Sequence, residues 1–330
     1  MRRRDFITLL GGATAAWPLA ARAQQSSGER RIGWLDIFPE NDPSSQARRK
    51  AFLETMERLG WVVGRNLEID DRWGLFDLAR ARAAGSEVLN LQPDLLLCAG
   101  APVTLAMQQV THTVPIVFTI VVDPVVMGVV PDLSHPGGNI TGFSYLELTI
   151  GTKWLGLLEE MAPSVSRVAL VFNPVSSPHS RLIYQLMETA AAKSAVQLST
   201  LTVSNPAEIE KALSDFAHEP GGGIILSADS FLYTNRKYIS ELAARYRLPA
   251  IYGVPGKAIE GGLMYYYTDV VETTRQAAGY VDRILRGEKT ADLPVQQPTK
   301  FVMSINLKAA KALDLPVPTT LLVSADEVIE

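Results

Sequence analysis

Short apolar runs alternate along the chain with longer segments whose apolar residues recur at helical spacing. The runs lack a strict alternation of apolar and polar positions, which indicates strands that are buried on both faces. This rhythm is typical of a parallel sheet flanked by helices. In the first half of the chain it predicts strands at 31–38, 66–72, 94–99 and 115–121, with helices at 44–59, 78–91 and 103–111.

The same rhythm starts again after a turn-rich stretch at 136–142. It predicts strands at 167–172, 197–203, 223–227 and 249–252, with helices at 178–192, 207–217 and 236–246. The remaining chain predicts strands at 262–267 and 301–305 and helices at 270–286 and 307–313. These last pieces are too few for a third domain, so we expect them to complete the two halves.

The two halves also resemble each other locally. An apolar run, a helix and a Pro-containing strand occur at 94–118 and again at 223–252. We therefore predict an α/β fold with two Rossmann-like lobes, each a parallel sheet flanked by helices, joined by a hinge that the chain crosses about three times. The expected ranges are 30–142 plus 268–297 for lobe 1 and 143–267 plus 298–330 for lobe 2.

The first 23 residues have the layout of an export signal. Arg2, Arg3 and Arg4 precede an apolar stretch at 6–20, and Ala21-Arg22-Ala23 offers a small-x-small cleavage site. The adjacent arginines and the glycines of the apolar stretch also fit a twin-arginine signal, and the sequence leaves open which export route is used. A membrane anchor is the alternative, but this stretch is short for the roughly 20 residues that a spanning helix needs. We predict removal of 1–23 and a periplasmic protein.

Charge and cysteine content narrow the class of protein. Without residues 1–23, 27 of the 31 basic and 34 of the 35 acidic residues remain, a net charge of −7. No basic tract remains, so nucleic acid is not expected as a partner. Cys98 is the one cysteine and lies in an apolar run, so we expect a buried thiol and no disulfide.

Motifs for catalysis are absent from the sequence. There is no G-x-S-x-G elbow, no phosphate-binding P-loop and no H-E-x-x-H motif. The glycines at 221–223 precede a predicted strand, whereas a dinucleotide fingerprint follows one. The four histidines lack metal-ligand spacing. We therefore predict no catalytic residues, no metal and no cofactor.

Polar and small residues instead follow the predicted parallel strands, where ligands bind in open α/β sheets. The turn Gly100-Ala101-Pro102 opens a helix whose free N–H groups could hold a carboxylate, although a plain strand-to-helix turn would read the same. Carboxylates at such ends would suit an ammonium group, or else cap the next helix. The candidate ligand-binding residues are Asp36, Gly100, Ala101, Pro102, Asp123, Asn173, Asp229, Phe231, Tyr252 and Tyr266.

Aromatic residues also gather near these strand ends, among them Phe38, Tyr145, Phe231 and Tyr252. In the run at 265–267 the middle tyrosine points away from its two neighbours, because side chains alternate between the faces of a strand. Not all three rings can therefore line one pocket.

Several stretches resemble one family, the ABC transporter substrate-binding proteins of the tryptophan/tyrosine type. The matching stretches are Val114-Pro-Ile-Val-Phe118, Asp123-Pro124, His135-Pro-Gly-Gly-Asn-Ile-Thr-Gly142, Leu248-Pro-Ala-Ile-Tyr252, Gly261-Gly-Leu-Met264, 277–285, Gln297-Pro-Thr-Lys-Phe301, Ile305-Asn-Leu-Lys308, 309–315 and Ala325-Asp-Glu-Val-Ile-Glu330. They cover nearly all of the chain after the signal, and the closing segment is the most specific part.

This resemblance implies a type I periplasmic-binding-protein fold with three hinge crossings and a ligand between the lobes. It also implies delivery to a membrane permease, with lobe closure as the signal and no chemical step. It supports Gly100, Ala101, Pro102, Asp123 and Asp229 as pocket positions. The chain departs from the family at 36–40, where small hydroxyl residues are more usual, and at 265–267, where Tyr-Tyr-Tyr replaces Ser-Tyr-Gly.

The sequence thus predicts a monomer that captures an amino acid or related carboxylate, with an aromatic side chain favoured, and delivers it to an ABC permease. N–H groups at 100–103 would bind the carboxylate, Asp123 or Asp229 the ammonium group, and Tyr252 and Phe231 the apolar part. Alternatives are an enzyme on the same scaffold, such as a racemase or lyase of a small acid, and a ligand-sensing partner of a membrane sensor. A transcription repressor shares the fold, but the export signal and the lack of a helix-turn-helix argue against it.

Overall fold

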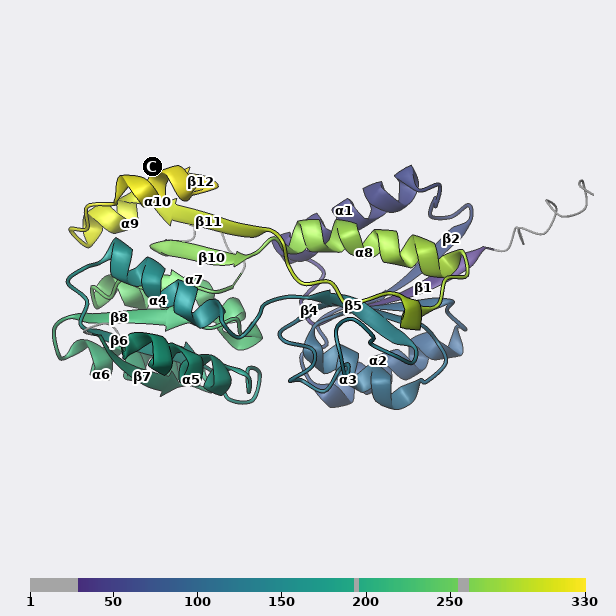
Figure 1. Cartoon of the computed structure of the whole chain (residues 1–330), viewed down its shortest axis with the longest axis horizontal. Coiled ribbons are helices and arrows are strands. Elements are labelled where there is room, and N and C mark those ends of the chain that lie inside the picture. Colours follow the sequence, from purple (N-terminus) through teal and green to yellow (C-terminus); the bar gives the residue numbers. More distant parts are fainter. Residues whose placement is uncertain (1–28, 193–195, 255–260) are drawn as a thin grey trace, which may run out of the picture.

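The computed structural model describes residues 29–192, 196–254 and 261–330. Two α/β lobes lie side by side along the long axis of the molecule (Figure 1). Each lobe has its own sheet with helices on both faces, so the predicted fold is confirmed. The expected export signal at 1–23 lies outside the described residues. No helix in the described ranges is long and apolar enough to cross a membrane.

Lobe 1 contains a parallel sheet of five strands in the order β2-β1-β3-β4-β5. Helices α1 and α8 pack together on one face, and α2 and α3 pack together on the other (Figure 1). The elements are β1 (Arg30–Asp36), α1 (Pro43–Arg58), β2 (Leu67–Arg72), α2 (Leu78–Asn90), β3 (Leu95–Ala99), α3 (Ala101–Val110), β4 (Ile116–Val121), β5 (Ile140–Ser144), α8 (Val270–Leu285) and η3 (Thr290–Asp292).

Lobe 2 contains a sheet of seven strands in the order β12-β11-β10-β9-β8-β6-β7. Helices α4 and α5 pack on one face, and α6 and α7 on the other. The elements are α4 (Ile150–Met161), β6 (Arg167–Phe172), α5 (Ser180–Ala191), β7 (Gln197–Thr202), α6 (Pro206–Ala217), β8 (Gly222–Leu226), α7 (Ser230–Arg245), β9 (Ala250–Tyr252), β10 (Met264–Thr268), β11 (Phe301–Asn306), α9 (Leu307–Ala312), α10 (Thr319–Ser324) and β12 (Glu327–Ile329).

The central strands are buried as their sequences predict. Every residue of β3 and of β8 is buried, because helices cover both faces of each sheet. Cys98 lies in the middle of β3 with no exposed surface, and burial raises the pKa of its thiol. It is therefore a small apolar core residue, as expected.

Four features differ from the sequence-based expectation. The turn-rich stretch continues into a buried edge strand, β5, and helix α4 follows directly. Helix α7 starts at Ser230, six residues before the expected start, because Asp229 caps its first N–H groups. Strand β11 runs antiparallel to β10, so the lobe 2 sheet is mixed. Helix α10 and strand β12 complete the C-terminal edge of this lobe.

The chain passes between the lobes in three places: after β5, between β10 and α8, and between η3 and β11. The three passages are hydrogen bonded to one another. Ser144 donates its N–H to the carbonyl of Gln296 at 2.8 Å, and the hydroxyl of Thr268 donates to the carbonyl of Tyr145. Three adjacent connections restrict how the lobes can move and favour a hinge-like opening.

Candidate functional site

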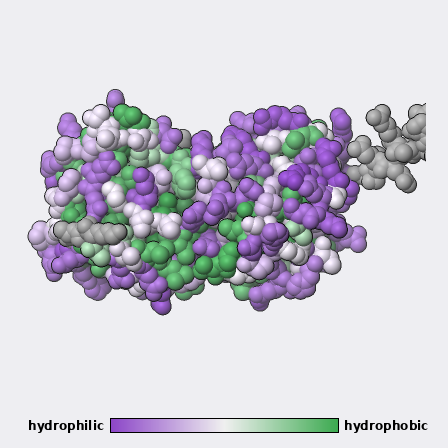
Figure 2. All heavy atoms as spheres, in the orientation of Figure 1, coloured by the Kyte–Doolittle hydropathy of each residue, from purple (hydrophilic) through white to green (hydrophobic). Residues whose placement is uncertain are grey.

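A cavity of about 60 Å³ lies between the two lobes. Its walls come from the residues that follow the carboxyl ends of strands in both sheets, which is where open α/β sheets bind ligands. On the face shown in Figure 2, hydrophobic residues gather near the junction of the lobes. The cavity is lined by Ile37, Phe38, Ser44, Ala101, Pro102, Ile120, Val122, Tyr145, Ser176, His179, Ala228, Asp229, Ser230, Tyr233, Val254 and Val270.

A larger hollow of about 510 Å³ lies elsewhere, at the opposite edge of the lobe 1 sheet. Arg30, Asp94 and Pro115 line it, and these residues stand at the amino ends of strands. The C-terminal end of α8 and the start of η3 also line it, so this hollow lies within lobe 1, at the strand ends opposite to those where open α/β sheets bind ligands. The smaller cavity between the lobes is therefore the better candidate for a solute site.

The first turns of five helices reach the cavity wall: α1, α3, α5, α7 and α8. Aspartates cap three of them: Asp42 on α1, Asp229 on α7 and Asp269 on α8. Helices α3 and α5 have no side-chain cap bond, and the N-cap of α3 is Gly100, which has no side chain to accept from the first turn. The N–H groups of Ala101 and Val103 cannot bond within the helix. They therefore leave a site for an anionic group on the lobe 1 side.

Among the residues that the structure describes, Asp229 is the one acidic side chain on the cavity wall, and it comes from lobe 2. Its Oδ1 accepts from the Phe231 N–H at 2.7 Å and the Ser176 hydroxyl at 2.6 Å, while its Oδ2 accepts from the Asn173 N–H at 2.6 Å. Burial raises the pKa of this carboxyl, and these hydrogen bonds oppose the rise. Asp229 therefore caps α7, and its Oδ2 accepts one of these three bonds.

His179 adds a neutral polar group to the same wall. Its Nε2 lies 2.9 Å from the hydroxyl of Ser177. The Ser177 hydroxyl is hydrogen bonded to that of Ser180, which is hydrogen bonded to that of Ser227, and all three serines are buried. Burial lowers the pKa of His179 to about 4, so the imidazole is uncharged at neutral pH. Among the described residues, no arginine or lysine lines the cavity.

Three of the ten predicted site residues line the cavity: Ala101, Pro102 and Asp229. Two others, Gly100 and Asn173, do not line the cavity but contact residues that do. Gly100 holds φ at 108° at the start of α3, where a Cβ would lie 2.6 Å from the Ile37 side chain. Asn173 positions the Ser176 loop, because its Oδ1 accepts from the N–H groups of Val175 and Ser176.

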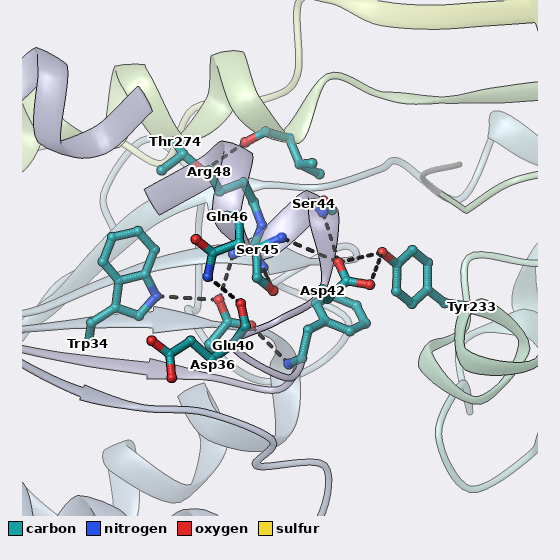
Figure 3. Close-up of polar contacts among 12 residues, drawn as sticks. Trp34, Asp36, Glu40, Asp42, Ser44, Ser45, Gln46, Arg48, Tyr233 and Thr274 are labelled. Carbon is teal, nitrogen blue, oxygen red and sulfur yellow. Dashed lines mark hydrogen bonds and ion pairs between the residues drawn. The ribbon is translucent and has the colours of Figure 1, made fainter. Parts of the chain in front are cut away.

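Asp36 and Asp123 do not reach the cavity wall. Asp36 is fully buried, and its carboxylate accepts from Arg48, Trp34 and the Phe38 N–H (Figure 3). Its place at the end of the first strand led us to expect a ligand-binding residue, but the side chain points into the interior of lobe 1. Asp123 bends its own loop: φ is 38°, and its Oδ1 accepts from the Val126 N–H at 3.2 Å.

The aromatic candidates also lie away from the cavity. Tyr252 is fully buried in lobe 2, where its ring stacks on Tyr265 with centroids 4.5 Å apart. Tyr266 points to the other face of β10 and stacks on Phe301 at 5.4 Å. Phe231 packs against the lobe 2 core. These rings therefore stabilise lobe 2, and the aromatic wall of the cavity is formed by Phe38, Tyr145 and Tyr233 instead.

The sequence reasoning missed Ser44, Ser176, His179 and Tyr233 as cavity residues. All four belong to first helical turns or to the loops that lead into them. The available signal was their place just after a predicted strand. Tyr233 was missed because the helix was predicted to start at 236, whereas α7 starts at Ser230 and has Tyr233 in its first turn.

This chain is similar, over most of its length, to several known proteins. The chain is 25% identical over 291 residues to a tyrosine-binding protein of Clostridioides difficile (strain R20291), covering 88% of this chain and 82% of that protein. A conserved domain protein of Vibrio cholerae matches with a TM-score of 0.82 and 27% identity, covering 91% and 99% of the two chains. An ABC domain from Streptococcus pneumonia in complex with L-Trp matches with a TM-score of 0.83 and 20% identity, covering 92% and 100%.

A sequence model described as "ABC transporter substrate binding protein" matches residues 38–329, which include both lobes and every residue of the cavity wall except Ile37. This match covers most of the chain and agrees with the two-lobe fold and with the cavity at the carboxyl ends of both sheets. The chain therefore belongs to the family of ABC transporter substrate-binding proteins.

Proposed function

We propose that this protein binds a free amino acid with an aromatic side chain between its lobes and delivers it to an ABC permease in the membrane. The observation that carries the proposal is the pairing of two complementary groups across one cavity. The uncapped first turn of α3 in lobe 1 suits a carboxylate, and the Asp229 carboxylate in lobe 2 suits an ammonium group.

The walls between these two groups support an aromatic side chain. Phe38, Tyr145 and Tyr233 line the cavity together with Ile120 and Val122. Aromatic and aliphatic walls favour an apolar ligand, with a few polar groups fixing its orientation. The names of the similar proteins agree with this class, since one is a tyrosine-binding protein and another carries L-Trp.

The delivery cycle follows from having one binding group on each lobe. A ligand that bridges α3 and Asp229 interacts with both lobes only when they are closed, so it stabilises the closed form. We propose lobe ranges of 30–142 plus 268–297 and 143–267 plus 298–330, a cleaved export signal at 1–23 and a periplasmic monomer. We further propose that the protein catalyses no reaction during this cycle and has no nucleic-acid partner.

Thermal unfolding with added solutes tests the ligand class. At a ligand concentration 1,000 times Kd, binding stabilises the folded state by about 4 kcal/mol. We expect L-tyrosine, L-tryptophan or L-phenylalanine at about 1 mM to raise Tm by several degrees. The matching amino acid amide and the deaminated acid should not, because each lacks one of the two charges. A shift with sugars or peptides alone would overturn the ligand assignment.

Asp229→Asn tests the ammonium site without removing the helix cap, because an Asn side chain also caps helices. We expect the affinity for the amino acid to fall at least tenfold, since a charge-assisted hydrogen bond is lost. Asp77→Asn is the matched control, because Asp77 caps α2 through the Arg80 N–H and does not line the cavity. Equal affinity in both variants would rule out Asp229 as the ammonium partner.

NMR of the ligand recovered after incubation tests whether the protein catalyses a reaction. We expect the spectrum of the ligand to be unchanged.

A further inference from the structure

One residue of the cavity wall has a strained backbone. Ile120, near the end of β4, has a φ of 57°, in the left-handed region. A β-branched side chain is disfavoured there, because it crowds the neighbouring backbone. Glycine adopts the same conformation without this cost. Strained residues gather at functional sites, and Ile120 lines the cavity between the lobes.

The strain belongs to a β-bulge at the end of β4. From Phe118 to Val121, β4 advances three residues, whereas their partners on β5, Gly142 and Ser144, are only two apart. On its other side, β4 stays paired with β3 as far as the residue before Ile120. The irregularity therefore falls on Ile120, where φ is positive. A bulge of this kind inserts one extra residue and redirects the side chains around it.

The bulge changes which side chains of β4 enter the core of lobe 1. In a regular strand, Ile120 would share a face with Ile116 and Phe118, because side chains alternate between the two faces. Instead, Val121 joins Ile116 and Phe118 in one buried cluster. Ile120 is only partly buried, and it lines the cavity together with Val122. The strained backbone thus frees the Ile120 side chain from the core for the cavity wall.

Hydrogen bonds on both sides of Ile120 fix its position. The carbonyl of Thr119 accepts from the Gly100 N–H at 2.9 Å, and the carbonyl of Val121 accepts from the Tyr145 N–H at 2.8 Å. The first bond connects the bulge to the turn that opens α3, where we propose that a carboxylate binds. The second connects it to an aromatic residue of the cavity wall. Ile120 therefore lies between the proposed carboxylate site and the aromatic wall.

We propose that Ile120 determines specificity by limiting the size of the ligand side chain that fits beside the first turn of α3. The size limit rests on the proposed function, since it concerns an amino acid bound at that turn. The Ile120 side chain packs against the core cluster of Phe118 and against that of Tyr145, so it has little freedom to move aside. A difference of one methylene group in an apolar pocket changes relative affinity about 10- to 200-fold.

Calorimetric titration with L-phenylalanine and L-tryptophan tests the size limit. Ile120→Gly removes the side chain and suits the positive φ. We expect it to raise the ratio of the Kd for L-phenylalanine to the Kd for L-tryptophan at least tenfold, because the larger ring gains the added space. Thr200→Gly, at an exposed position of the edge strand β7, is the control and should leave this ratio unchanged. The same ratio in Ile120→Gly and the unaltered protein would overturn the proposal.

Thermal unfolding without added ligand tests the backbone strain separately. In an ordinary strand, a glycine variant is less stable than the alanine variant, and Thr200 should follow this order. At position 120 we expect the reverse, with Ile120→Gly melting about 2 °C above Ile120→Ala, because alanine keeps a Cβ at positive φ. The same order at both positions would refute the strain. If neither amino acid binds the unaltered protein, the proposed ligand is wrong, while the order at position 120 still decides whether Ile120 is strained.

Discussion

The buried ion pair of lobe 1 gives the sharpest stability test. Arg48 on α1 and Asp36 at the end of β1 both have no exposed surface, and their Nη1 and Oδ2 atoms are 2.6 Å apart. Arg48 also donates to the Ser45 hydroxyl at 3.1 Å. The pair lies beside the loop that carries Phe38 and Asp42, so it supports one wall of the cavity (Figure 3).

Arg48→Met removes the cation and leaves the Asp36 carboxylate buried with two neutral donors, the Trp34 indole and the Phe38 N–H. Removing one member of a buried pair costs about 3–5 kcal/mol, because the remaining charge is uncompensated. We expect a loss of that size in the free energy of unfolding. At roughly 2 °C per kcal/mol for a chain of this size, Tm falls by about 6–10 °C.

The double variant Asp36→Asn with Arg48→Met removes both charges and keeps an acceptor for Trp34 and Phe38. It should recover most of the loss, because a neutral, well-packed replacement of a buried ion pair is close to neutral in stability. Urea unfolding followed by tryptophan fluorescence measures all three proteins. Lys211→Met, which breaks an exposed pair with Asp215, should show no measurable change. A double variant as unstable as Arg48→Met would refute the reasoning.

Two further predictions concern the cavity wall and the packing behind it. Burial lowers the pKa of His179 from 6.5 to about 4, so the unfolded chain binds this proton more tightly, and the free energy of unfolding falls by roughly 3 kcal/mol between pH 6.5 and 4. In urea titrations, the His179→Asn variant should show a smaller fall in the free energy of unfolding between pH 6.5 and 4. The same fall in the variant and the unaltered protein would contradict the assignment to His179. Gly253→Ala should destabilise by about 1–3 kcal/mol, because its Cβ would lie 2.3 Å from Trp154 and 2.9 Å from the Leu226 carbonyl oxygen. Gly156→Ala, on the exposed face of α4 with no atom near its Cβ, should instead stabilise by about 0.5–1 kcal/mol in thermal melts; equal effects would exclude the steric explanation.

Local patterns predicted most of the elements and the fold. β3 and β6 are recognisable because their apolar runs are bounded by turn residues, and α1 and α8 because their apolar residues recur at helical spacing. Among the missed elements, α4 is a 12-residue helix, whereas β5 and α10 are short and lie at a sheet edge or near the end of the chain. Their stability comes from neighbours that are distant in sequence, which a local pattern does not contain.

The candidate site was predicted only as far as strand ends could be located. Ala101, Pro102 and Asp229 line the cavity because each opens a helix immediately after a buried strand. Asp36 occupies an equivalent place but is turned inward by Arg48, which lies 12 residues further along the chain. Asp36 and Asp229 look alike in sequence, and only packing distinguishes them.

The sequence by itself determined two α/β lobes and the strand ends of each sheet that border the cavity, because apolar periodicity and helix-starting residues act over a few positions. The tertiary structure alone decided which side chains face the cavity and which contacts close it. Tyr233 meets Asp42 only because two separately folded lobes are brought together by three adjacent connections. Such a contact depends on the relative position of whole sheets, which no local pattern records.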